Sequence, residues 1–105
     1  MTSEVEIEVR DDGTLSLGGA LTFDSTPVVF ERLDDRIRSA DTRVTIDLDR
    51  IERIDSSGLA LLLEWQAVVM QRDNSLQIHN APDSLIKLAH LCEADKLLDM
   101  SERIA

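Results

Sequence analysis

The chain has 105 residues, of which 43% are hydrophobic and only 3% aromatic, so one domain with a mainly aliphatic core is expected. Its 21 acidic and 11 basic residues give a formal net charge of −10. Such a charge disfavours binding to nucleic acid or anionic lipid headgroups, and it favours partners with a basic docking surface.

The N-terminal segment predicts a β-hairpin. Residues 5–9 alternate apolar and polar side chains with period two, as a half-buried strand does. The Asp-Asp-Gly at 11–13 is a hairpin turn signal, and residues 14–17 return as a second strand. Gly18 and Gly19 follow, and we expect them to break or bend the chain there.

The first helix is predicted to begin within residues 23–27, with Pro27 near its first turn. An apolar face at helical spacing supports it, made by Val28, Val29, Leu33 and Ile37. Residues 44–48 alternate again and predict the next strand, at the centre of the sheet. Residues 49–54 are less regular and lead into a turn.

That turn, a strand-to-helix junction, is the most informative stretch of the chain. Asp55 and Ser56 are both good helix N-caps, because their side-chain oxygens accept hydrogen bonds from free backbone N–H groups. Gly58 allows close approach of the backbone, and a second helix is predicted from about residue 58 to 72. Because a helix N-terminus attracts anions, a phosphate on Ser56 or Ser57 would be tolerated there.

The C-terminal third predicts a strand at 76–78, a turn at 80–82, a third helix starting near Pro82, an interruption at 92–95 and a short final turn or strand at 96–98. Ile104 is predicted to pack back on the sheet. Strands and helices alternate after the initial hairpin. The chain is therefore predicted to be an α/β domain, with a mixed sheet of four or five strands and helices packed mainly on one face.

The Asp-Ser-Ser-Gly-Leu sequence at 55–59, between a hydrophobic strand and an apolar helix, resembles the signature of STAS domains. That family includes anti-sigma factor antagonists, the cytoplasmic tails of sulfate transporters and the small STAS subunit of the Mla phospholipid-transport ABC complex. The resemblance covers nearly the whole chain and implies that residues 1–105 form one STAS domain with the SpoIIAA-like fold. It also makes Ser56 the candidate phosphoacceptor, since the signalling members are phosphorylated on the serine after the aspartate.

No catalytic, cofactor or metal site is predicted. The chain has neither a phosphate-binding P-loop, nor a Gly-x-Gly-x-x-Gly dinucleotide loop, nor a Gly-x-Ser-x-Gly nucleophile elbow. Its two histidines, His79 and His90, lack the cysteine or carboxylate spacing of a metal site. Ser56 itself has three interpretations: a structural cap, a phosphoacceptor, or an unmodified residue at the centre of a binding surface.

The second helix carries more apolar residues than one buried face needs. We expect its core-facing stripe to consist of Leu59, Leu62, Leu63, Ala67 and Met70. A second stripe, Leu61, Trp65 and Val68, would then be left exposed to bind a partner; the alternative is that both stripes are core. The predicted partner-binding residues are Asp55, Ser56, Ser57, Gly58, Leu61, Trp65 and Val68.

Two functions follow from the resemblance. Residues 59–65 and 80–91 resemble the MlaB-type STAS subunit, which implies a non-enzymatic protein that docks on the cytoplasmic ATPase of an Mla-type ABC transporter. The alternative is an anti-sigma factor antagonist that is switched when a serine kinase phosphorylates Ser56. The Gly-Ala-Leu-Thr at 19–22 counts modestly against this alternative, because the family often has Gly-Glu-Leu-Asp there. A generic scaffold without a regulated site is a third, weaker possibility.

The cellular location of the protein is predicted from three features of the sequence. It has a single cysteine, Cys92, no secretory signal, and a longest apolar run at 59–63 that is far shorter than the roughly 20 residues of a membrane span. We therefore expect a cytoplasmic protein without direct membrane insertion, held at the inner membrane through its partner complex. The sequence leaves open the transported lipid, the stoichiometry, self-association and whether Ser56 is ever phosphorylated.

Overall fold

The computed structural model describes residues 5–103 and contains one five-stranded mixed sheet. The strands are β1 (Val5–Val9), β2 (Leu15–Leu21), β3 (Val44–Ile54), β4 (Leu76–Ala81) and β5 (Asp99–Glu102), which neighbour one another in that order. The β1–β2 pair is antiparallel, as a hairpin requires, and the other three pairs are parallel. The predicted α/β fold with a mixed sheet is confirmed.

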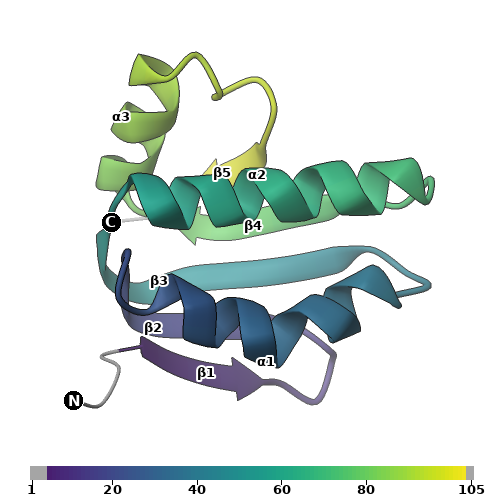
Figure 1. Cartoon of the computed structure of the whole chain (residues 1–105). Coiled ribbons are helices and arrows are strands. Elements are labelled where there is room, and N and C mark those ends of the chain that lie inside the picture. Colours follow the sequence, from purple (N-terminus) through teal and green to yellow (C-terminus); the bar gives the residue numbers. More distant parts are fainter. Residues whose placement is uncertain (1–4, 104–105) are drawn as a thin grey trace.

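Three helices connect the parallel strands: α1 (Thr26–Arg38), α2 (Ser56–Gln71) and α3 (Asp83–Leu91). Each links two adjacent parallel strands, and the sheet grows in one direction, so right-handed crossovers place all three on the same face. In Figure 1, α1 and α2 lie side by side across that face, and α3 stands at one end near β4 and β5. The expectation that helices pack mainly on one face is also confirmed.

The core fills the space between the sheet and the helices. Its fully buried side chains come from every layer, and the largest include Leu17, Leu21, Ile46, Leu48, Leu62, Trp65, Ile78 and Leu85. Burying each such side chain contributes about 1.5–3 kcal/mol of hydrophobic free energy. As composition predicts, aliphatic residues dominate, and one tryptophan is the largest member.

Three strands, β2, β3 and β4, are longer than the sequence indicates. Gly18 and Gly19 do not end β2, which continues to Leu21 with shifts in its register against β3. Gly19 has φ +80°, a conformation that glycine adopts without strain, so the strand bends without breaking. β3 likewise continues past Leu48 to Ile54, because its second half pairs with the bent part of β2.

The C-terminal prediction is partly wrong. Asn80 and Ala81, which were predicted to begin a turn, are the last residues of β4. Residues 96–98 form a turn, one of the two predicted alternatives, and β5 follows it from Asp99. Leu98 at the end of this turn is buried in the core. Pro27 does occupy the first turn of α1, as expected. Ile104 lies outside the described residues.

Candidate partner-docking site

Asp55 organises the turn between β3 and α2. Its Oδ1 accepts hydrogen bonds from the backbone N–H groups of Ser57 (2.9 Å) and Gly58 (3.3 Å), so Asp55 is the N-cap of α2. Its Oδ2 accepts the N–H of Phe23 at 3.0 Å. One carboxylate therefore fixes both the start of α2 and the loop that leads from β2 to α1.

Gly58 lies in the first turn of α2, where the helix packs tightly against the ends of β2 and β3. A Cβ atom at this position would come within 2.7 Å of both the Leu21 carbonyl oxygen and Ile54 Cγ1. No side chain fits at that distance. The close approach expected from the sequence is thus made to the chain's own Leu21 and Ile54, and Gly58, predicted to bind a partner, is buried.

Ser56 is the part of this turn that projects into solvent. It is exposed, and within residues 5–103 its hydroxyl makes no hydrogen bond. The N–H groups of Ser57 and Gly58, which would otherwise attract an anion, are already occupied by the Asp55 carboxylate. A phosphate on Ser56 would therefore stand beside a negative charge and would change the electrostatics of the surface sharply.

The predicted exposed stripe of α2 is wrong in its main residue. Trp65 is 0% exposed and lies in the core, and its indole Nε1–H donates to Asp34 Oδ1 of α1 at 3.0 Å. Leu61 is also buried, at 6% exposure, and Val68 is half-buried. The reason is that α1 packs alongside α2 and covers this side of the helix, which leaves Trp65 and Leu61 with no free surface to offer a partner.

A different stripe of α2 faces outward. It consists of Ser56, Ala60, Leu63, Ala67 and Met70, which are spaced four, three, four and three residues apart and so share one side of the helix. All are exposed except Leu63, which is half-buried, and Met70 is 60% exposed. Ala67 and Met70 were predicted to face the core, so that assignment is also corrected. We call these five residues the outward stripe.

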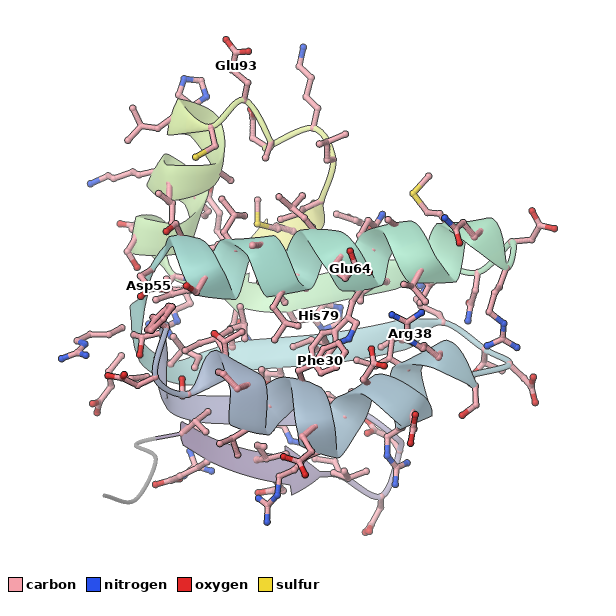
Figure 2. All side chains as sticks on the ribbon, in the orientation of Figure 1. Phe30, Arg38, Asp55, Glu64, His79 and Glu93 are labelled. Atoms are coloured by element: carbon pink, nitrogen blue, oxygen red, sulfur yellow. The ribbon has the colours of Figure 1, made fainter. Side chains whose placement is uncertain are left out.

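The outward stripe is uncharged, in a protein of net charge −10. The only charged residue of α2 is Glu64, beside the stripe, and its Oε1 lies 3.7 Å from Arg38 Nη2 of α1. Figure 2 shows Glu64, Arg38 and Phe30 on the same side of the molecule, along the two neighbouring helices. Phe30 is 41% exposed and adds an aromatic ring to this side.

Sequence reasoning missed one further exposed residue, Phe23 in the loop before α1. Its side chain is 77% exposed, although its backbone is bonded to Asp55. A signal was available: Phe23 precedes Pro27, which lies in the first turn of α1, so it falls outside the buried face of that helix. Ser25, the residue before α1, is buried and bonds the backbone at Ala20 and Thr22, which holds the loop in place.

The face of the sheet without helices carries a polar network around Asp47. Its carboxylate forms an ion pair with Arg10 at 2.8 Å. It also accepts hydrogen bonds from the side-chain amide of Asn80 and from the backbone N–H of Asp49, each at 2.9 Å. Burial alone would raise the pKa of Asp47, but these hydrogen bonds outweigh it and lower the pKa. The same contact raises the pKa of Arg10. This network lies on the sheet and takes no part in the α2 surface.

Within the described part of the chain, no group of three or more His, Cys, Asp or Glu side chains is arranged to hold a metal ion. Among the helices found in residues 5–103, none combines the length and apolarity that a membrane crossing requires.

A family model described as "Mlab, STAS domain" matches residues 6–99. The chain belongs to the MlaB-type STAS domain family. Over 78 residues this STAS domain is 31% identical to the intermembrane phospholipid transport system binding protein MlaB of Escherichia coli (strain K12). The aligned region covers 74% of this chain and 77% of that protein. The protein of the same name from Shigella flexneri matches with the same values. The membership of the STAS family that residues 55–59 indicated is confirmed.

Solved structures confirm that this STAS domain has the expected SpoIIAA-like fold. A putative anti-sigma factor antagonist from Thermotoga maritima superposes with a TM-score of 0.76 at 14% identity, covering 95% of this chain and 87% of the other. Unphosphorylated SpoIIAA gives 0.69 at 16% identity, covering 95% and 89%. A STAS domain protein from Planctomyces limnophilus gives 0.74 at 11%, covering 97% and 92%. At these identities the likeness establishes the fold alone.

Proposed function

We propose that this chain is the non-enzymatic STAS subunit of an Mla-type phospholipid ABC transporter. In this role it docks on the cytoplasmic ATPase subunit of the transporter and supports the assembly or activity of the complex. The docking surface consists of the exposed part of the Asp55–Ser56 turn together with the outward stripe of α2. The chain itself touches neither lipid nor nucleotide, and it associates with the inner membrane only through the complex.

The observation that carries this proposal is the uncharged outward stripe. A helix of a soluble protein normally shows charged residues to water on its exposed side, yet α2 exposes Ser56, Ala60 and Ala67 there. Small side chains let a partner's backbone approach closely, and Met70 at the far end supplies a flexible apolar contact. The names of the similar MlaB proteins, which assign them to a phospholipid transport system, support the choice of partner.

A negative charge at Ser56, at the N-terminal end of the outward stripe, is expected to weaken docking. Ser56 begins the outward stripe, so a negative charge introduced here would have to be desolvated when the partner docks. Repulsion from the Asp55 carboxylate would add to that cost. Ser56→Glu is therefore expected to weaken docking, whereas Ser56→Ala, which keeps the surface small and neutral, should preserve it.

The test is co-purification of the chain with the ATPase subunit encoded in the same genome. We expect Ser56→Glu and Ala60→Arg to reduce the amount of ATPase recovered, and Ser101→Glu, an exposed serine on β5, to leave it unchanged. Circular dichroism of each variant checks that the fold is intact. Undiminished recovery with both Ser56→Glu and Ala60→Arg would rule out this face as the docking surface.

One observation favours a second candidate function, an anti-sigma factor antagonist switched by phosphorylation. The Ser56 hydroxyl is exposed and makes no hydrogen bond within residues 5–103, so a serine kinase could reach it. Against this, Ala20 is buried, so one position where signalling members often carry an acidic residue is used here for packing. Intact mass measured on protein isolated from cells decides: a phosphorylated fraction located at Ser56 favours the switch.

A further inference from the structure

Phe23 is an aromatic ring that the fold holds out in solvent. It is 77% exposed, and among the large hydrophobic side chains of residues 5–103 only that of Leu91 is more exposed. The loop around it is fixed: the Phe23 N–H donates to Asp55 at 3.0 Å, the Thr22 N–H donates to Ser25 Oγ at 2.9 Å, and Ser25 Oγ donates to the Ala20 carbonyl at 2.6 Å. A ring presented by an ordered backbone binds a partner at a low entropic cost.

A groove runs beside this ring, between the loop, the end of β3 and the start of α3. Three of its lining residues carry carboxylates, Asp24, Glu52 and Asp55, and only one, Arg53, is basic. Within residues 5–103 the side chains of Asp24 and Glu52 make neither a hydrogen bond nor an ion pair. Their charges are thus available to a partner, and they add to the field of a protein of net charge −10.

We propose that the groove beside Phe23 receives an arginine or lysine side chain of the docked protein. The cation would lie against the face of the Phe23 ring and between the carboxylates of Asp24 and Glu52. An aromatic face attracts a cation through its quadrupole, and flanking carboxylates add direct charge attraction. This inference rests on the proposed function, since the ATPase is the protein that would supply the basic residue, and it names the chemistry of that contact.

The position of the groove fits this role. Asp55, which caps α2 and begins the Ser56 turn, also lines the groove, so the groove continues the surface that starts at Ser56. The outward stripe would bury uncharged helix surface, and the groove would add a charged contact at its N-terminal end. Such a contact sets orientation and association rate more than it sets total affinity.

The test is the dissociation constant for the purified ATPase subunit, measured by calorimetry at low and at high ionic strength. Phe23→Leu keeps an apolar side chain but removes the aromatic face, and the double variant Asp24→Asn with Glu52→Gln removes the charges. We expect each to weaken binding by about 5- to 30-fold at low salt. The double variant should also lose much of the salt dependence seen for the wild-type protein. Leu91→Ala, a 79% exposed residue on α3 away from this groove, should bind like wild type.

Each contrary result has its own meaning. If Phe23→Leu and the acidic double variant bind like wild type while Ser56→Glu does not bind, the groove is unused and the proposed function stands. If Phe23→Leu weakens binding but the double variant does not, the contact is apolar and the basic occupant is excluded. If the wild-type protein itself does not bind the ATPase, the proposed function fails and this inference fails with it.

Discussion

The two sides of α2 are held by different forces. On the inner side, Leu62, Trp65 and Val69 are at most 1% exposed and pack against the sheet and α1. On the outer side, Ala60 and Ala67 are exposed and touch little of their own chain. Apart from Glu64, which lies beside the outward stripe, both sides are uncharged, so hydrophobicity alone does not separate them. What separates them is packing: the inner residues stabilise the fold, and the outer residues are exposed and form part of the docking surface that we propose.

The largest expected effect is on the inner side. Trp65→Ala should lower the free energy of unfolding by about 3–5 kcal/mol, because it leaves a large cavity between α1 and α2. It also removes the donor to Asp34. Urea denaturation followed by circular dichroism measures this loss.

Trp65→Phe is the matched control, since it retains a ring in the cavity and loses mainly the hydrogen bond. Its cost should be clearly smaller than that of Trp65→Ala. If Trp65→Ala were as stable as wild type, Trp65 would not belong to the core, and the contrast between the two sides of α2 would be wrong.

The second largest effect on stability is expected at Gly58, where the start of α2 packs against β2 and β3. Gly58→Ala should destabilise the protein by about 1–3 kcal/mol, because the new methyl group would overlap Leu21 and Ile54. Ser56→Ala, two residues away but exposed, should stay within about 0.5 kcal/mol of wild type. Equal stability of the two variants would contradict the close contact between α2 and β2.

The sequence predicted the fold well because its strongest signals are local. The alternation in residues 5–9, the Asp-Asp-Gly turn and Pro27 each specify one element, and the motif at 55–59 places the junction between β3 and α2. β3 was predicted too short because residues 49–54 carry charges that break the alternation. These residues are held in the strand by pairing with a bent β2, which is a tertiary effect.

The exposed side of α2 was predicted less well than the fold, because the sequence of this helix gives little indication of which side faces the core. A helix that is apolar nearly all round has no periodicity that shows which stripe faces the core. Trp65 was assigned to the surface because tryptophan is common at interfaces, but α1 covers it. Glu64 and Gln71, seven residues apart, do mark the solvent side. Counting outward from them would have identified Ala60 and Ala67.

The smallest expected effect is a change in how stability depends on pH, and it comes from Asp47 on the face of the sheet without helices. Folding lowers the pKa of Asp47, so the ionised carboxylate stabilises the folded protein. This contribution is complete at pH values above about 3.9, the pKa of an aspartate in the unfolded chain. That contribution is lost as the pH falls through the lower pKa of the folded state. Asp47→Asn should therefore be less stable near pH 7 and should lose less stability on acidification than wild type.

Unfolding free energies of wild type and Asp47→Asn between about pH 7 and 3 measure this difference. Ala67→Arg is the control, since it leaves the Asp47 network intact and should follow the wild-type pH profile. A wild-type profile for Asp47→Asn would show that the network does not couple folding to pH.

The outward stripe is tested most directly by measuring stability and ATPase affinity on the same variant, Ala67→Arg. The substitution is at an exposed position, so the free energy of unfolding should remain within about 0.5 kcal/mol of wild type. Binding should weaken by about tenfold or more, because a long charged side chain would then stand in a small, uncharged contact surface. An unchanged affinity in a fully folded Ala67→Arg protein would contradict the assignment of this side of α2 to partner docking.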